Sequence, residues 1–253
     1  MQGTRQAMSG KFLRPGVVRR LTLLIVSLSV SQLSWSMGLR SFVALPVEKG
    51  GQVLRLQMER NDDSDVNTAI ASLAYGLSGK QTLMFGLPYR VSPSGADQLG
   101  DFSALYRHIV WQVDAPGRTS RLGLLGGAVI PTESGRDGAI QAGAVATFYR
   151  GRYEWDLDVL YQSGRADRPD AGRYDISWQY RLTPAEYPDW GLVPEWDVVL
   201  ELGGRYSEGH STTHQATGGL QWVHRRWVLE GGITKDLNGP RDRRALLSFR
   251  WHF

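Results

Sequence analysis

The stretch YEWDLDVLY (153–161) places apolar and charged side chains in near-perfect alternation. Successive side chains of a β-strand point to opposite faces. One face of this strand therefore carries Tyr153, Trp155, Leu157, Val159 and Tyr161, and the other carries Glu154, Asp156, Asp158 and Leu160. An apolar face with an aromatic residue at each end is typical of strands in membrane β-barrels, where lipid lies outside and water inside. A soluble sandwich also alternates, but it tends to bury its aromatic residues in mid-strand.

The same pattern recurs in YDISWQYRL (174–182), in WDVVLELGGRY (196–206) and in the final residues LLSFRWHF (246–253). In the last stretch Phe249, Trp251 and Phe253 share one face. A strand buried in a sandwich core is the alternative interpretation. The aromatic face instead predicts the closing strand of a barrel, which pairs with the first strand near 51–61. It also predicts a signal that barrel-assembly machinery reads.

Twelve strands account for the whole pattern. We expect them near 51–61, 67–76, 81–91, 101–113, 119–130, 140–149, 152–162, 173–182, 195–206, 214–224, 226–235 and 243–253. The connections that follow odd-numbered strands are polar and mostly long, whereas those that follow even-numbered strands are mostly short, as in barrels with outer loops and periplasmic turns. The predicted fold is an all-β, antiparallel, up-and-down transmembrane β-barrel. Ten or fourteen strands are the alternatives, because 101–113 and 119–130 alternate poorly.

Residues 1–36 resemble an export signal. They carry Arg5, Lys11, Arg14, Arg19 and Arg20 but no acidic residue, followed by the apolar run LTLLIVSLSV (21–30) and the cleavage-like SWS (34–36). A retained anchor is the alternative, although the run is shorter than the roughly 20 apolar residues of a spanning helix. We therefore expect a signal peptide at 1–36, a barrel domain at 37–253, and export to the outer membrane of a Gram-negative bacterium.

Charge and cysteine content set further bounds. The whole chain has 29 basic and 25 acidic residues, and without the five basic residues of the signal the balance is 24 to 25. The high isoelectric point therefore comes largely from the signal and does not indicate nucleic-acid binding. The chain has no cysteine, so no disulfide framework can be inferred. No motif for a cofactor or metal is apparent.

The second face of the strands predicts what the barrel encloses. A barrel of this size falls between small filled barrels and open porins. The polar residues expected to line the lumen are Arg55, Gln57, Glu59, Arg90, Glu154, Asp156, Asp158, Asp175, Gln179, Arg181, Asp197, Glu201, Arg205, Glu230 and Arg250. The acids gather at 152–206, so they could face arginines across an aqueous pore. Alternatively the charges pair and fill the lumen, because buried ions need partners.

Two other features have weaker interpretations. Gly-Gly pairs at 126–127, 203–204, 218–219 and 231–232 predict strand curvature, with space for a ligand as the alternative. Outer-membrane lipid hydrolases use a Ser/His pair, for which His108, His210, Ser211 and His214 are the candidates. Nucleophilic catalysis needs a base beside the serine and a third group that orients the base. The sequence shows no such arrangement, and we predict no catalytic site.

Several short motifs together resemble a known family. They are AYGLSGK (74–80), LMFGLPYR (83–90), LGDFSALYRH (99–108), AVIPTESG (128–135) and YDISWQYRLTPAEY (174–187). Residues 44–253 resemble the outer-membrane transporters named for the MetA pathway of phenol degradation, although Glu133 stands where that family usually has Gly. The resemblance implies an outer-membrane barrel that passes small, often hydrophobic or aromatic, compounds.

The predicted function is therefore an outer-membrane channel or transporter for passive or facilitated passage of small molecules. A filled, structural or surface-interaction barrel is the second prediction, and a lipid-modifying enzyme the third. The expected partners are outer-membrane lipid, the barrel-assembly machinery and a solute that the sequence does not identify.

Overall fold

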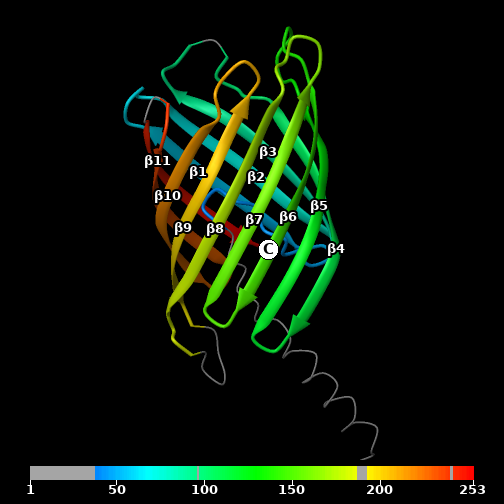
Figure 1. Cartoon of the computed structure of the whole chain (residues 1–253), viewed down its shortest axis with the longest axis vertical. Coiled ribbons are helices and arrows are strands. Elements are labelled where there is room, and N and C mark those ends of the chain that lie inside the picture. Colours follow the sequence, from blue (N-terminus) through cyan, green and yellow to red (C-terminus); the bar gives the residue numbers. More distant parts are fainter. Residues whose placement is uncertain (1–37, 96, 187–192, 240–241) are drawn as a thin grey trace, which may run out of the picture. The chain divides into compact units, whose positions relative to one another are not determined.

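The computed structural model describes residues 38–95, 97–186, 193–239 and 242–253 (Figure 1). These residues form twelve strands in one closed antiparallel barrel, as predicted. The strands are β1 (Gln52–Asn61), β2 (Asn67–Ser78), β3 (Gln81–Ser92), β4 (Phe102–Ala115), β5 (Arg118–Ile130), β6 (Ala139–Arg150), β7 (Tyr153–Gly164), β8 (Ala171–Thr183), β9 (Glu195–Ser207), β10 (Thr213–His224), β11 (Trp227–Asp236) and β12 (Arg243–His252). The alternatives of ten and fourteen strands were wrong.

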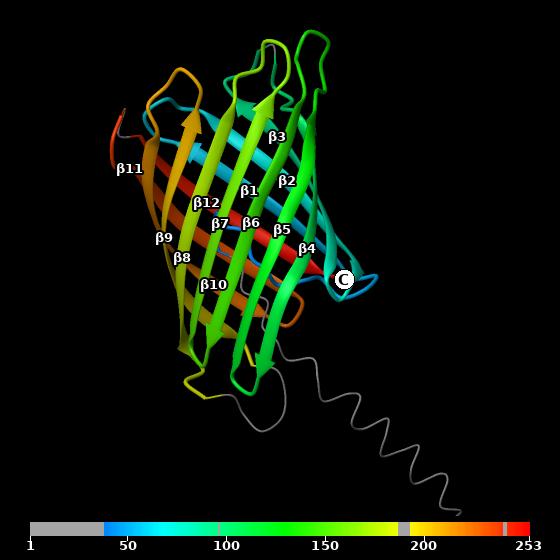
Figure 2. The same cartoon turned by 45° about the vertical axis from the view of Figure 1, so that its right-hand side comes forward.

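Each strand pairs with its sequence neighbours, and the first strand pairs with the last. Val53 of β1 lies opposite His252 of β12, and the Phe253 amide donates to the Gln52 carbonyl at 2.9 Å. The connections after odd-numbered strands gather at one end and most of the short turns at the other (Figures 1 and 2). Gly117 and Gly151 have positive φ values of 68° and 62° in two such short turns, a conformation that suits glycine. We call these the loop end and the turn end.

The two faces of the wall differ as the alternation predicts. On β7, Trp155 and Val159 are 46% and 52% exposed on the outside, whereas Glu154 and Asp156 are 5% and 0% exposed on the inside. Near the turn end Trp196 and Trp222 stack at 5.6 Å between ring centroids, and Trp227 meets Trp222 edge-on at 4.8 Å. An apolar outer wall with an aromatic cluster near one rim is suited to contact with lipid.

Strand β4 explains why residues 101–113 alternate poorly. The pairing of β4 with β5 shifts register between Ile109 and Trp111, which is a β-bulge. Because a bulge adds one unpaired residue, it changes which positions face outward. Val110 and Trp111 are consequently both 47% exposed. The bulge accounts for the poor alternation of this stretch, and the strand itself was predicted within two residues of its ends.

The junction between β3 and β4 has the shortest ladder in the barrel. Six residue pairs join these strands, ending at Gly86 and Ser103, whereas every other neighbouring pair of strands shares nine or more. Pairing resumes beyond the gap, where the Gly100 amide donates to the Pro88 carbonyl at 2.8 Å. The wall is closed there, but it is held by fewer backbone hydrogen bonds.

The predicted signal peptide at 1–36 lies outside the described residues. Within the part that is described, no helix is long and apolar enough to cross a membrane.

Candidate lumen site

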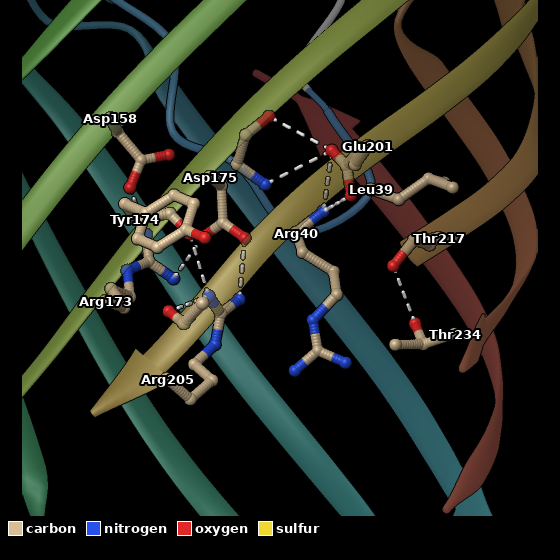
Figure 3. Close-up of polar contacts among 12 residues, drawn as sticks. Leu39, Arg40, Asp158, Arg173, Tyr174, Asp175, Glu201, Arg205, Thr217 and Thr234 are labelled. Carbon is tan, nitrogen blue, oxygen red and sulfur yellow. Dashed lines mark hydrogen bonds and ion pairs between the residues drawn. The ribbon is translucent and has the colours of Figure 1, made fainter. Parts of the chain in front are cut away.

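Residues 38–47, which we call the lumen segment, lie inside the barrel. The segment precedes β1 and touches strands from most of the ring through the contacts described below. Leu39, Val43 and Ala44 are 0–2% exposed, although they belong to no strand. At the turn end the segment reaches the wall, where the Gly50 amide donates to the Gly76 carbonyl at 2.8 Å. Figure 3 shows Leu39 and Arg40 beside strand β9.

Carboxylates on β7 and β9 bind backbone amides of the segment. Glu201 accepts hydrogen bonds from the Arg40 amide at 3.0 Å, the Ser41 amide at 3.3 Å and the Ser41 hydroxyl at 3.1 Å (Figure 3). Asp158 accepts from the Phe42 amide at 2.7 Å. Hydrogen bonds to an ionised acceptor are stronger than bonds between neutral groups. Two acids of the wall, Asp158 and Glu201, therefore bind peptide N–H groups of the segment.

Arginines bind the carbonyls of the same segment. Arg107 of β4 donates to the carbonyl oxygens of Val43 and Leu45, the second at 2.6 Å, and to the Thr82 hydroxyl at 3.2 Å. Arg55 of β1 donates to the Leu39 carbonyl. Amides and carbonyls of one chain are thus held by opposite charges on different parts of the wall.

Two apolar contacts also hold the segment in the lumen. Leu39 packs with Val199 and Leu246, and its Cδ1 lies 2.6 Å and 2.9 Å from where a Cβ would stand on Gly219 and Gly232. These inward glycines belong to the pairs 218–219 and 231–232, so space for another part of the chain adds to the predicted role in curvature. Ala44 packs in a second cluster with Leu105, Ile109, Leu125, Val145 and Leu160.

The structure places the predicted lumen residues on the inside of the wall. Those that are 0–7% exposed are Glu154, Asp156, Asp158, Asp175, Gln179, Arg181, Asp197, Glu201, Glu230 and Arg250. Those that are half-buried are Arg55, Gln57, Glu59, Arg90 and Arg205. The predicted assembly signal Phe249, Trp251 and Phe253 faces outward, with 38%, 37% and 66% exposure. The geometry of these residues does not test their roles.

Many wall charges neutralise one another. Glu230 binds both Arg250 and Arg55, the latter at 2.9 Å. Among the acids of β7–β9, Asp175 pairs with Arg205 at 2.8 Å and Asp158 with Arg173 at 3.2 Å. Several acids of 152–206 are therefore paired with arginines of the same strands and do not face arginines across the lumen.

Glu201 and Arg107 are two of the buried charges outside this pairing. They are 4% and 2% exposed, and among the described residues neither has an opposite charge within ion-pair distance. Their hydrogen-bond partners are the lumen segment and, for Arg107, also Thr82. Burying a charge is costly unless hydrogen bonds compensate. The segment therefore satisfies charges that the wall itself leaves unpaired.

A second charged cluster joins three connections at the loop end. Asp101, with its side chain 11% exposed, accepts from Arg168 at 2.6 Å and from Arg136 at 3.1 Å. Burial alone would raise the pKa of Asp101, but the hydrogen bonds from Arg168 and Arg136 outweigh it and hold the pKa below its ordinary value. The connections β3–β4, β5–β6 and β7–β8 are thereby tied together.

The histidines weighed as catalytic candidates have other partners. His108 lies beside the Tyr106 hydroxyl at 3.3 Å, and His214 beside the Tyr174 hydroxyl at 2.8 Å. The ring of His210 lies 3.2 Å from the Glu208 carbonyl. In the described ranges no serine hydroxyl, including that of Ser211, is hydrogen-bonded to a histidine ring.

Sequence reasoning missed the lumen segment, which it assigned to the barrel domain without a role. The signal was the run GLRSFVALPV (38–47), which is largely apolar, lacks strand alternation and ends beside a proline. A stretch of this length is longer than is needed to connect an export signal to a first strand. Its contacts could not have been read from the sequence, because they join residues 16 to 161 positions apart, most of them 62 or more.

No family model matches this chain, and no curated protein matches it. Among solved structures it is similar to the KdgM porin, with a TM-score of 0.55 and 8% identity over 79% of this chain and 99% of the porin. It is also similar to the COG4313 outer membrane channel from Pseudomonas putida F1, with a TM-score of 0.55 and 19% identity over 83% of this chain and 97% of that channel. The fold is therefore that of outer-membrane β-barrels. The resemblance to the MetA-pathway transporters fits this fold. The likeness to those transporters in particular rests on the short sequence motifs.

Proposed function

We propose that this protein is an outer-membrane channel for small molecules and that the lumen segment closes it at rest. The observation that carries the proposal is a closed barrel whose polar interior is filled by a chain segment rather than by wall side chains alone. A wall that serves only as a scaffold has no need of buried charges, which cost free energy. The solved porin and channel of similar fold support a channel role.

The segment is attached in a way that permits release. Its contacts with the wall are hydrogen bonds to side chains, two apolar contacts, an ion pair between Arg40 and Glu59 and a cation–π contact between Arg173 and Phe42. It forms no ladder with any strand. Backbone hydrogen bonds between the residues before β1 and strand β2 begin only at Gly50 and Gly51. Removing residues 38–47 from the lumen therefore breaks none of the ladder hydrogen bonds that close the barrel.

The class of solute follows from the resemblance and from the wall. The resemblance implies small, often hydrophobic or aromatic, compounds. The KdgM porin has been solved in complex with oligogalacturonate, an acidic sugar. In this chain Glu154 and Asp156 of β7 and Asp197 of β9 lie on the inner wall, on the two strands that flank β8. A polyanion would meet like charges there, so we propose neutral or cationic solutes instead.

A permanently filled barrel is the second candidate, because the segment occupies the lumen and ion pairs join many of the wall charges. Sideways passage of apolar compounds at the short β3–β4 ladder is a variant of the channel proposal. We further propose that the chain reaches the outer membrane by its signal, and that the assembly machinery recognises Phe249, Trp251 and Phe253.

Single-channel conductance in a planar bilayer, with a salt gradient for ion selectivity, tests the proposal. A protease site inserted after Lys49, which is exposed, allows the protein to fold intact and then be cut. Discrete conductance steps are expected to appear or increase after cutting and loss of the fragment, as monitored by mass spectrometry. The protein without the inserted site, exposed to the same protease and therefore uncut, is the control. A correctly folded barrel that has lost the fragment but stays silent would refute the channel and favour the filled barrel.

A further inference from the structure

We propose that the lumen wall is a binding site for extended peptides, that the lumen segment occupies this site at rest, and that an incoming peptide displaces it. This inference deepens the proposed function by naming a solute class. Its binding test does not require conductance.

The wall recognises the backbone of the segment more than its side chains. Eight backbone groups of residues 39–47 are bound by wall side chains. The bound amides are those of Arg40, Ser41, Phe42, Ala44 and Val47, and the bound carbonyls are those of Leu39, Val43 and Leu45. Because every peptide repeats these groups, the contacts do not depend on one sequence.

Over residues 42–45 the contacts alternate between the two edges of the chain, as in an extended peptide, although the chain bends at Ala44. In an extended chain, the polar backbone groups of successive residues point to opposite sides. The amides of Phe42 and Ala44 bind Asp158 and Thr147 on β7 and β6. The carbonyls of the residues after them, Val43 and Leu45, bind Arg107 on β4. The wall therefore contacts both hydrogen-bonding edges of one strand, which a compact solute cannot supply.

Glu201 and Arg107, two wall charges that lie outside the ion pairs and that the segment satisfies, fit this use. Glu201 supplies only acceptors and Arg107 only donors, and they stand on β9 and β4. A peptide offers N–H groups to the first and carbonyls to the second. A hydrocarbon or a simple aromatic compound would leave both charges without a partner in a lumen from which it excludes water.

Apolar contacts add a preference to this backbone recognition. Leu39 occupies the space beside Gly219 and Gly232, and Ala44 contacts the cluster around Ile109. The favoured peptide therefore has a large apolar residue at one position and a small residue five positions later.

The test uses the cut protein described above and a fluorescein-labelled peptide of residues 38–48, with binding followed by anisotropy in detergent. The peptide is expected to bind and to be displaced by the same peptide without label. N-methylation at Phe42 and Ala44 removes two bound N–H groups and should weaken binding at least tenfold, since hydrogen bonds involving charged groups are the stronger ones. N-methylation at Val43 is the matched control, because in the described structure its amide makes no hydrogen bond.

Wall variants test the same contacts from the other side. Glu201→Gln should weaken peptide binding about tenfold, whereas Glu208→Gln on the exposed β9–β10 connection should leave it unchanged. Absence of peptide binding, failure to exchange with the resident fragment, or equal effects of the three N-methylations would overturn the inference. If the cut protein conducts but does not bind the peptide, the channel proposal stands and the peptide inference fails. If a silent barrel binds the peptide, the peptide inference stands and the channel proposal fails.

Discussion

Arg107 is the residue whose loss should open the barrel most clearly. Its guanidinium is 2% exposed and binds the carbonyls of Val43 and Leu45, and no carboxylate among the described residues pairs with it. Arg107→Met keeps much of the length and volume of the side chain and removes its donors. We expect the substitution to favour release of the lumen segment while the barrel stays folded.

The magnitude follows from the two bonds to the segment. A hydrogen bond to a charged group contributes roughly 1.5–3 kcal/mol net. Two bonds from one guanidinium are not independent, so about 3 kcal/mol for the pair is a conservative value. Because about 1.4 kcal/mol corresponds to a tenfold change, the ratio of open to closed protein should rise roughly 100-fold. The wall loses only the bond to Thr82, and it is relieved of a buried charge, so its thermal stability should hardly change.

Open probability in single-channel recordings measures this ratio, and thermal unfolding followed by circular dichroism checks the fold. Arg121→Met is the matched control, because Arg121 is also buried, stands on the adjacent strand β5, and pairs with Asp114 at 3.2 Å instead of with the segment. An open probability that changes less than twofold in folded Arg107→Met protein, or equally in both variants, would refute the reasoning.

Three further predictions concern other parts of the chain. Gly232→Ala should increase opening, because its Cβ would stand 2.9 Å from Leu39 Cδ1, and a Leu39→Ala partner substitution should cancel part of the effect in a double-mutant cycle of open probabilities. Asp101→Asn should speed proteolysis of the loop-end connections. In the unchanged protein the pKa of Asp101 is lowered, so its stabilisation is complete above the unfolded pKa of about 3.9 and is lost only as pH falls through the lower folded value; pepsin cleavage that already rises above pH 5 would contradict this. Deleting Phe253 should reduce the amount of assembled barrel in membranes far more than deleting Ser211 from the β9–β10 connection, and equal amounts would contradict the proposed assembly signal.

The barrel could be predicted because its pattern is local. Alternation along β7 depends only on one residue and the next, and pairing between consecutive strands follows from short connections such as that at Gly151. The weak point was β4, where the bulge near Val110 changes the facing of side chains. A bulge hardly changes the residue pattern of an apolar strand, so only the pairing with β5 reveals it.

The site was less predictable because its partners are distant in the chain. The sequence identified Glu201 and Asp158 as inward-facing acids, but not that they bind the amides of Arg40 and Phe42. Arg107 was not among the predicted lumen residues, although it alternates with Tyr106 and His108 on β4. Side-chain binding to a backbone leaves no residue pattern in the segment that is bound.

The closed ring also constrains the order in which this molecule can be built. β1 follows the lumen segment directly, and its pairing with β12 is the junction between the two ends of the sheet. If that junction forms while residues 38–47 lie within the curling sheet, the chain encircles its own beginning. If it forms first, those residues must be threaded into a finished cylinder from its turn end. Early enclosure gives Glu201 and Arg107 their partners before the interior is sealed, so the segment would act as a template around which the first and last strands meet.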